Sequence, residues 1–218
     1  MQKNNLNIKL VYFDFNFWRV DILRLCLSFA NIPYKYERIP RDEWGSRKNQ
    51  FPFRQLPVMF LDDKVYAHTH SLTRFCAHHS SLLDIDETKI LIIDQVIDWA
   101  NDITLKIAPS IRAEIREKNL KKAKNLRQKF IKNDLENWFL YLETLFANSS
   151  AKKEFFTDKF SVADITAWRL IEWFTSGKLN HVDTNFIDEF HLLKKLYSRV
   201  SNIKKFKSLV EFKEILKN

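Results

Sequence analysis

The chain has 218 residues, of which 45% are hydrophobic and 14% aromatic, and it carries a formal net charge of +9. This composition is that of a globular protein with a substantial apolar core, and it excludes a disordered or fibrous chain. No apolar run approaches the roughly 20 residues of a membrane-spanning helix, and the N-terminal MQKNNLNIKL lacks the apolar stretch of a signal peptide. We therefore expect a cytoplasmic protein that makes no membrane contact.

The first third of the chain predicts an α/β unit. A β-rich apolar run covers 8–13, apolar residues recur at helical spacing over 19–30, and an alternating strand follows at 34–39. A loop through Trp44 and Lys48 comes next. These elements are expected in the order β-α-β-loop, and two further strands and a helix follow them.

The stretch after this loop, FPFRQLPVMFL at 51–61, is the most informative part of the sequence. Pro57 cannot donate a backbone hydrogen bond, so it belongs at the start of a strand, where the backbone of Leu56 can face a ligand. After a short return strand, Thr69 is placed to cap a helix whose free N–H groups attract a carboxylate. Together these groups suit a peptide-like ligand with an acidic terminus.

Beyond residue 82 the chain predicts helices only. The helical patterns cover 89–108, 110–148, 161–176, 186–200 and 208–217. A capping box formed by Ser161 and Asp164 begins the third of these helices. We therefore expect two domains, an α/β domain over 1–82 and an all-helical domain over 83–218.

Glycine and cysteine are too scarce for several common kinds of site. The two glycines, Gly45 and Gly177, exclude a glycine-rich phosphate-binding loop and the nucleotide-binding folds built on one. Cys26 and Cys76 form neither a C-x-x-C redox pair nor a metal-ligand spacing, and both fall in helix-like apolar patterns. We interpret them as buried, reduced thiols.

Positive charge is concentrated between Arg112 and Lys132. This segment holds nine Lys or Arg residues against Glu114 and Glu117, a net +7. It has no aromatic side chain before Phe130 on which bases could stack, and solvated helix faces often carry such charge. We therefore predict no nucleic-acid binding, and we leave open a role in drawing anionic small molecules to a nearby cleft.

Two groups of residues raise the question of a metal. His68 and His70 form an H-x-H, but no third ligand stands at a supporting spacing, so we predict no metal site there. Asp94, Asp98 and Asp102 are four residues apart and share one helix face. Solvent, a ligand contact across a subunit interface and a divalent cation are all open ways to compensate their like charges.

The order of these features resembles the cytosolic glutathione transferase family, and its sigma-type branch most closely. The motifs that carry the resemblance are, in chain order, KLVYF at 9–13, RVDILR at 19–24, DEW at 42–44, FPFRQLPV at 51–58, RF at 74–75, DQVID at 94–98 and SVAD at 161–164. No single motif is specific, but their order and spacing are. The resemblance implies a thioredoxin-like α/β N-terminal domain followed by an all-α C-terminal domain.

The resemblance also implies a catalytic pair, Tyr12 at the end of the first strand and Arg19 beside it. A free thiol has a pKa near 8.5, so only a small part of it is thiolate at neutral pH. A phenol that donates a hydrogen bond to the sulfur of glutathione, with a guanidinium close by, favours the thiolate.

Further positions match glutathione-binding residues of the family. They are Trp44, Lys48, Gln55, Leu56, Pro57, His68, Thr69 and Asp102. The backbone of Leu56 would pair with the cysteinyl part of glutathione just before a cis bond to Pro57, and Asp102 would reach the γ-glutamyl amine bound by the neighbouring subunit. We expect the adjacent electrophile pocket to be lined by Phe13, Phe15, Trp18 and Thr104.

We therefore expect a homodimeric glutathione transferase that conjugates glutathione, as co-substrate, to small hydrophobic electrophiles in detoxification, with no resident metal. The loop 14–18 departs from the family pattern, because it lacks a glycine and is one residue longer. Arg54 replaces a glycine and His68 a glutamine. These departures leave open a non-catalytic binding or structural protein of the same fold, and a glutathione-dependent isomerase uses the same site.

Overall fold

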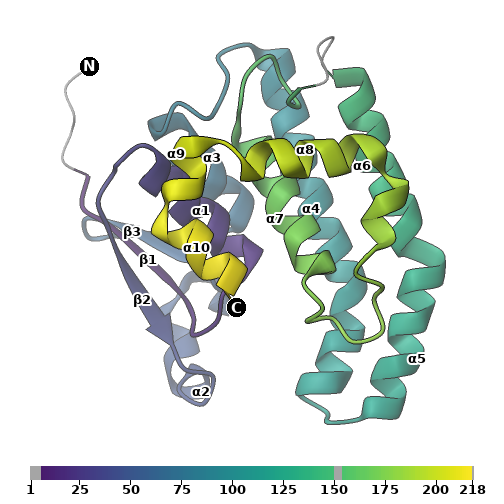
Figure 1. The fold of residues 1–218 in the computed structure, drawn as a ribbon. Coiled ribbons are helices and arrows are strands. Elements are labelled where there is room, and N and C mark those ends of the chain that lie inside the picture. The colour runs from purple at the N-terminus through teal and green to yellow at the C-terminus, as the bar shows by residue number, and fades with distance from the viewer. Residues whose placement is uncertain (1–5, 150–153, 218) are drawn as a thin grey trace. The chain divides into compact units, whose positions relative to one another are not determined.

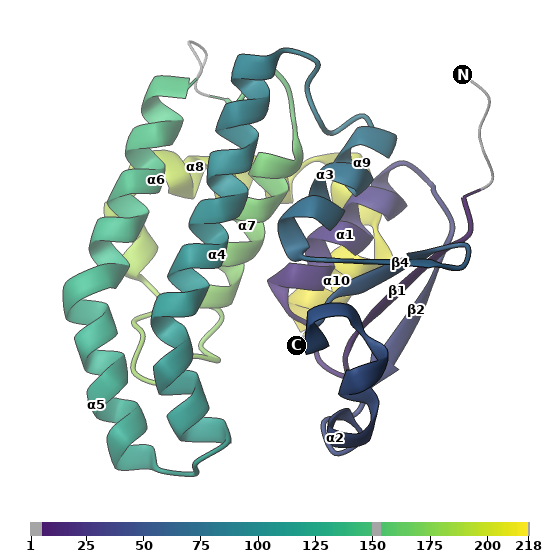
Figure 2. The same cartoon turned by 180° about the vertical axis from the view of Figure 1, so that it is seen from behind.

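The computed structural model describes residues 6–149 and 154–217. Its contacts divide the chain into two compact units. The first unit comprises Met1–Asp84 together with Ile203–Asn218, and the second comprises Ile85–Asn202. Figures 1 and 2 show the elements of each unit from opposite sides. No helix in the described part of the chain is both long and apolar enough to cross a membrane.

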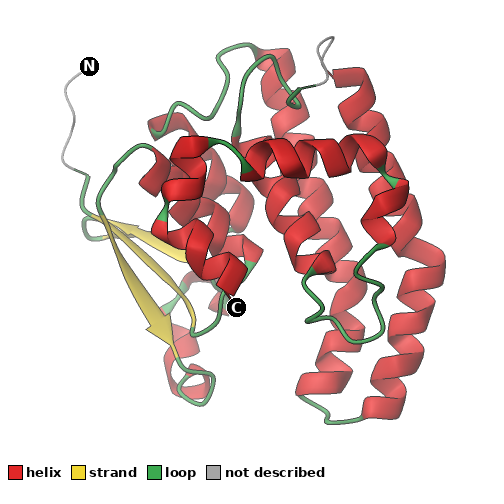
Figure 3. Ribbon diagram, viewed as in Figure 1, coloured by secondary structure: helices red, strands yellow, loops and turns green. Residues whose placement is uncertain are grey.

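The first unit contains a four-stranded sheet, which is yellow in Figure 3. Its strand order is β2-β1-β3-β4. The first strand, β1 (Ile8–Phe13), pairs in parallel with β2 (Tyr34–Ile39) and antiparallel with β3 (Val58–Leu61). The edge strand β4 (Lys64–Ala67) pairs antiparallel with β3. A parallel pair needs a crossover connection, and α1 (Trp18–Phe29) supplies it.

Short helical turns and one longer helix complete the part of this unit that lies before residue 84. The turns between β2 and β3 are α2 (Trp44–Arg47), η1 (Lys48–Gln50) and η2 (Pro52–Arg54). The longer helix, α3 (Thr69–His79), follows β4 and packs against α1. The α/β architecture predicted from the sequence is confirmed.

The two cysteines lie in the packed helices of this unit. Cys26 in α1 and Cys76 in α3 are both buried and both free thiols, as the sequence predicted. Burial raises the pKa of the Cys76 thiol to about 12, because the charged thiolate is poorly solvated there. Both side chains therefore act as small core residues at neutral pH.

The last two helices, α9 (Lys204–Ser208) and α10 (Val210–Lys217), also belong to the first unit and contact α1. The sequence prediction placed everything beyond residue 82 in one helical domain, so the structure differs at 203–218. Phe206 and Phe212 are buried in the first unit, which explains the return of the chain. Such a long-range contact leaves no trace in local periodicity.

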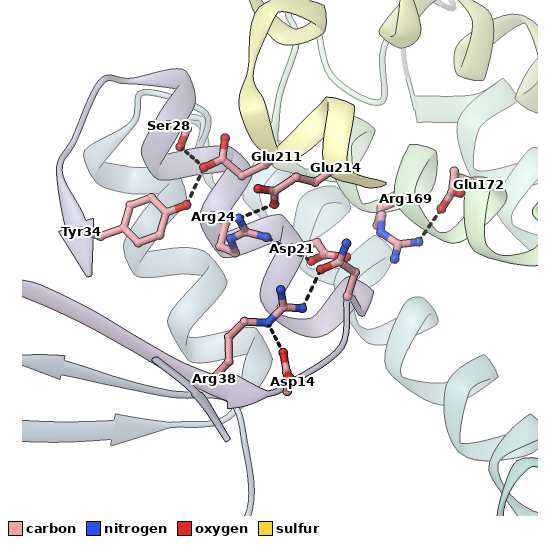
Figure 4. A network of polar contacts seen from close by, with 11 residues as sticks. Asp14, Asp21, Arg24, Ser28, Tyr34, Arg38, Arg169, Glu172, Glu211 and Glu214 are labelled. Atoms are coloured by element: carbon pink, nitrogen blue, oxygen red, sulfur yellow. Dashed lines mark hydrogen bonds and ion pairs between the residues drawn. The ribbon is translucent and has the colours of Figure 1, made fainter. Parts of the chain in front are cut away.

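Polar contacts fix this returning segment to α1 and β2 (Figure 4). Glu211 accepts hydrogen bonds from the hydroxyls of Ser28, at 2.8 Å, and Tyr34, at 2.6 Å. One turn further, the Glu214 carboxylate accepts a hydrogen bond from the Arg24 guanidinium at 2.8 Å. The outer face of α1 is therefore covered by the end of the chain.

The second unit is helical throughout its described residues. It contains α4 (Glu87–Ile115), α5 (Leu120–Phe130), the π-helical turn η3 (Ile131–Leu135), α6 (Glu136–Ser149), α7 (Val162–Thr175), the 3₁₀ turn η4 (Phe186–Glu189) and α8 (His191–Ser201). The central helix is α7, in which every residue from Val162 to Phe174 is buried. It packs against both α4 and α8. The all-helical character predicted from the sequence is confirmed.

The sequence prediction ended a helix at Pro109, but α4 continues through this proline to Ile115. A proline inside a helix removes one N–H and leaves the carbonyl of Leu105 without its usual partner. Both residues lie on the exposed side of α4, where water can satisfy that carbonyl. The actual break comes at Lys118, whose φ is 51°, and Asn119, whose side chain caps α5.

The capping box at the start of α7 is present as predicted. The Asp164 side chain accepts hydrogen bonds from the backbone N–H of Ser161, at 2.8 Å, and from its hydroxyl, at 3.0 Å. It accepts a third from the backbone N–H of Phe156 at 2.9 Å. A buried carboxyl thus fixes both the start of the helix and the chain that leads into it.

Candidate functional site

The candidate site lies in the first unit, at the end of β1, where Tyr12 is the penultimate residue of the strand. Only 3% of Tyr12 is exposed. Its ring meets Phe13 and Phe15 edge-on, with centroids 5.4 Å and 5.7 Å away, and stacks on Phe17 at 6.5 Å. The phenol is therefore held among aromatic rings in the described structure.

Burial and charge act on this phenol in opposite directions. Burial raises the pKa of Tyr12 well above its ordinary value, and the guanidinium of Arg19 lowers it. Burial also lowers the pKa of Arg19, and Tyr12 counteracts that effect. At neutral pH Tyr12 is thus an uncharged hydroxyl beside a half-buried cation in the first turn of α1. Such a pair can donate a hydrogen bond to an anion and stabilise its charge.

The loop between β1 and α1 is held by contacts on both sides. The Arg38 guanidinium lies 2.9 Å from the Asp14 carboxylate and donates to the Asn16 side chain at 3.0 Å (Figure 4). The guanidinium of Arg41 sits 4.7 Å from the centre of the Phe15 ring. These contacts hold the bulky residues of the glycine-free loop beside Tyr12.

Trp18, which the sequence interpretation placed in this loop as a pocket residue, is the first residue of α1. Its side chain is fully buried, so it belongs to the core of the first unit. Phe13 and Phe15 remain half-buried beside Tyr12.

The loop after β2 brings Trp44 to the same place. Trp44 is the first residue of α2, and its ring meets Phe13 edge-on at 5.0 Å and stacks on Phe51 at 6.0 Å. Leu56 belongs to the same apolar cluster as Tyr12. The structure therefore brings together three residues from separate predicted motifs, at 12, 44 and 56.

The peptide bond between Leu56 and Pro57 is cis, as the resemblance implies. Both residues are buried, and β3 begins at Val58, directly after the proline. Two predicted polar contacts earlier in the chain, Lys48 and Gln55, differ in exposure. Lys48 is half-buried at the start of η1, and Gln55 is exposed after η2.

The N-terminus of α3 differs in detail from the sequence prediction. The prediction made Thr69 the cap, but His68 occupies the cap position and Thr69 is the first helical residue. His68 makes no side-chain capping hydrogen bond to this helix in the part of the chain that the structure describes. The Thr69 hydroxyl is buried and has no hydrogen-bond partner among the described residues. His68 has a φ of 71° and its ring lies 4.4 Å from that of Phe53.

The remaining predicted residues lie in α4 of the second unit. Asp102 is exposed, on the same helix as Asp94 and Asp98. Thr104 is buried, and its hydroxyl donates to the carbonyl of Ala100 at 2.7 Å. Within residues 6–149 and 154–217, no three His, Cys, Asp or Glu side chains are grouped so that they could hold a metal ion.

Sequence reasoning missed part of the surroundings of Tyr12. Phe51 and Arg41 both contact aromatic residues of the cluster, and neither was predicted as a site residue. The density of aromatic residues at 13–18 and 51–53 was the available signal for Phe51. Arg41 had none, because its contact depends on how the loop after β2 returns to the sheet.

Comparisons with known proteins identify the family. A family model described as "Glutathione S-transferase, C-terminal domain" matches residues 102–211. A glutathione S-transferase of Anopheles gambiae is 38% identical over 86 residues, which are 39% of this chain and 42% of that protein. The alignment to this relative thus spans less than half of its length. Glutathione S-transferase 2 of Onchocerca volvulus is 25% identical over 213 residues, 97% of this chain and 96% of that protein.

Solved structures show the same fold along nearly the whole chain. The structure of prostaglandin synthase D of Nilaparvata lugens superposes with a TM-score of 0.78 and 25% identity, covering 94% of this chain and 97% of that one. Monomeric Na-GST-3 of Necator americanus superposes with a TM-score of 0.75 and 24% identity, covering 94% and 96%. The family match covers half of the sequence and the fold agrees, so the chain belongs to the glutathione S-transferase family.

Proposed function

We propose that this protein is a glutathione transferase of the sigma type that conjugates glutathione to small hydrophobic electrophiles. The observation that carries the proposal is the pairing of a neutral phenol, Tyr12, with the Arg19 guanidinium, in one cluster with Trp44 and Leu56. The names of the relatives support the transferase activity.

Each part of glutathione has matching chemistry in the first unit. The backbone of Leu56 suits the cysteinyl amide, and the positive dipole end of α3, where His68 makes no side-chain capping bond among the described residues, suits the γ-glutamyl carboxylate. The hydroxyl of Thr69, which has no hydrogen-bond partner in the described part of the chain, adds a donor at this helix end. Lys48 and Trp44 serve the glycyl end, where a cation and an indole N–H both favour a carboxylate.

The sulfur of glutathione is then placed at the Tyr12 hydroxyl. The phenol donates a hydrogen bond to the thiolate, and the Arg19 charge adds to its stabilisation. The thiolate attacks the electrophilic carbon, a carbon–sulfur bond forms, and the leaving group departs with the bonding electron pair. Phe13 and Phe15 offer apolar surface for the electrophile.

The test is Tyr12→Phe, which removes the hydroxyl and keeps the ring. Conjugation of glutathione to a generic aryl halide should fall by about tenfold or more, since one donor to a developing or stabilised anion is worth roughly this much or more. Glutathione binding measured by calorimetry should change little. The matched control is Tyr66→Phe in β4, whose tyrosine is 45% exposed and lies outside the cluster. Unchanged turnover in Tyr12→Phe would remove this residue from the mechanism.

A second candidate is a glutathione-dependent isomerase. It is favoured by the similarity to the prostaglandin synthase D of Nilaparvata lugens. The same thiolate would then attack a substrate and leave again without net conjugation. A substrate panel decides between the two: net loss of free thiol indicates transfer, and product formation with thiol unchanged indicates isomerisation. Glutathione binding without either activity would favour a non-catalytic protein of this fold.

We extend the proposal to a homodimer in the cytoplasm, in which Asp102 contacts the γ-glutamyl amine held by the neighbouring subunit. The exposed position of Asp102 supports the contact with a second subunit. The two free thiols support the cytoplasm. Asp102→Ala should raise the KM for glutathione several-fold with little change in kcat, because a ground-state contact is lost. The control is Asp98→Ala on the same helix face. A monomer in analytical ultracentrifugation would contradict the cross-subunit contact.

A further inference from the structure

The segment from Arg112 to Lys132, here called the basic hairpin, contains the end of α4, the connection to α5 and all of α5. It lies at one end of the helical unit, at the bottom in Figures 1 and 2. Every residue from Ile115 to Lys122 is exposed. The proposed transferase chemistry uses none of these residues, so the charge of this hairpin calls for an explanation of its own.

Most cations of the basic hairpin have no carboxylate partner among residues 6–149 and 154–217. Arg127 is buried and paired with Glu114, and Lys122 pairs with Glu117 at 2.7 Å. The other seven are exposed and form no ion pair with any residue that the structure describes: Arg112, Arg116, Lys118, Lys121, Lys124, Lys129 and Lys132. Their charge is therefore available to an external anion.

Helical geometry places the lysines of α5 on one side. Ala123, Arg127 and Phe130 are buried, and their spacing of four and three residues marks the inward face. Lys121 and Lys129 lie on the opposite, outward face. There they border a groove of about 290 Å³ that is lined by Asn119, Lys121, Lys122, Asn125, Leu126 and Lys129. Amide and ammonium groups together suit a phosphate-containing headgroup.

Exposed apolar side chains stand beside this charge. Leu120 is 71% exposed and Ile115 is 45% exposed, both at the turn between the two helices. An aliphatic side chain among lysines matches a lipid surface, where the apolar group enters the acyl boundary and the cations meet the headgroups. Nucleic acid is less well matched, because Phe130 is the segment's one aromatic residue and is buried, so no ring is open for stacking.

We propose that the basic hairpin is a peripheral docking surface for membranes that carry anionic lipids. The lysines of α5 and the groove take the headgroups, and Leu120 with Ile115 enters the interface. Such docking needs no spanning helix, so it departs from the expectation of no membrane contact that the lack of a long apolar run suggested. It also goes beyond the proposed transferase activity. It would bring hydrophobic electrophiles dissolved in the bilayer close to the enzyme.

The test is co-sedimentation of the full-length protein with vesicles of phosphatidylcholine, with and without phosphatidylserine. We expect binding only to the vesicles that contain phosphatidylserine, and we expect the protein to be released as the salt concentration rises. Replacing Lys121, Lys124 and Lys129 by Glu should weaken binding about tenfold or more, since attraction becomes repulsion on one face. Leu120→Ser should weaken binding several-fold and leave more of it sensitive to salt.

A control with the same change in net charge replaces Lys195, Lys204 and Lys213 by Glu, because these lysines are exposed outside the basic hairpin. This variant should keep most of the binding. The unfolding midpoints of both triple variants should match that of the unmodified protein, which would show that both variants are folded. Equal loss in both variants, equal binding to neutral vesicles, or an absence of binding would overturn the proposal. So would a gel shift of duplex RNA that is tighter than vesicle binding and unaffected by Leu120→Ser.

Discussion

At Tyr12, the catalytic role that we propose depends on a hydroxyl that keeps its proton. Burial raises the pKa of Tyr12, and the opposing effect of Arg19 is smaller. A phenol of this kind does not act as a base toward a thiol. It lowers the free energy of the thiolate by donating a hydrogen bond to it, and the proton of the thiol leaves to solvent or to another acceptor.

The first prediction concerns Phe15, which covers Tyr12 edge-on. Phe15→Ala should admit water and lower the pKa of Tyr12 toward its ordinary value of 10.0, because burial is the main cause of the shift. Ultraviolet absorbance of tyrosinate, taken as the difference between Phe15→Ala and the Phe15→Ala, Tyr12→Phe double variant, measures this pKa. Phe53→Ala is the control, since Phe53 is 68% exposed. A pKa unchanged by Phe15→Ala would show that this ring does not shield the phenol.

Motif positions could be predicted at this scale, but their packing could not. Tyr12, Trp44 and Leu56 were predicted from three separate segments, and they fall in one cluster. The ring contacts of Phe15 depend on Arg38 and Arg41, which reach the loop from beyond β1. No pattern within the loop specifies such contacts. The sequence therefore indicated that large side chains lie beside the phenol, but the orientation of their rings could not be predicted from it.

At the scale of single elements, the start of α7 shows how one buried carboxyl can organise a helix. Burial raises the pKa of Asp164 to about 7, while three donors from Phe156 and Ser161 lower it. The folded chain therefore holds a proton on this group from about pH 4 to about pH 7, where the unfolded chain has lost it. It follows that the contribution of Asp164 to stability falls as pH rises through this interval.

The second prediction uses Asp164→Asn, which cannot titrate. Urea unfolding near pH 4 should show a loss of about 1 to 3 kcal/mol, because the amide cannot accept all three hydrogen bonds. This loss should shrink as pH rises to about 7, following the sign above. Asp158→Asn serves as control, since its side chain is 70% exposed and its ion pair with Lys89 is worth less than about 1 kcal/mol. A loss that instead grows with pH would mean that Asp164 is ionised in the fold throughout.

Local chemistry explains which helix ends were predictable. The capping box of Ser161 and Asp164 spans only four residues, so the start of α7 could be predicted from the sequence alone. The rule that a proline ends a helix failed at Pro109, because exposure lets water take over the lost hydrogen bond. Whether a helical proline is exposed depends on neighbouring helices, and that information is not local.

At the scale of the whole molecule, the return of residues 203–218 to the first unit is the main departure from the sequence prediction. Glu211 is buried and accepts two hydroxyl hydrogen bonds, so removal of the carboxylate would take away an acceptor from both Ser28 and Tyr34. Burial and the hydrogen bond to Glu211 both raise the pKa of Tyr34, which therefore stays a donor at neutral pH.

The third prediction is a double-mutant cycle with Tyr34→Phe and Glu211→Gln. The two residues should show a coupling free energy of about 1 to 2 kcal/mol in urea unfolding, as expected for a hydrogen bond to a charged acceptor. The control pairs Tyr34→Phe with Lys213→Ala, an exposed residue of the same helix, and should be additive. Additivity in the first cycle would show that α10 is held by its apolar contacts alone.

The return of the chain also sets an order of events during synthesis. The sheet, Arg24, Ser28 and Tyr34 leave the ribosome early, while the carboxylate partners of these three side chains emerge 177 to 190 residues later. The nascent thioredoxin-like half consequently keeps one helix face uncovered until α10 has been synthesised. A premature stop codon that removes α10 would therefore destabilise the part of the polypeptide that was made first, although the lost codons lie far downstream of those that encode it.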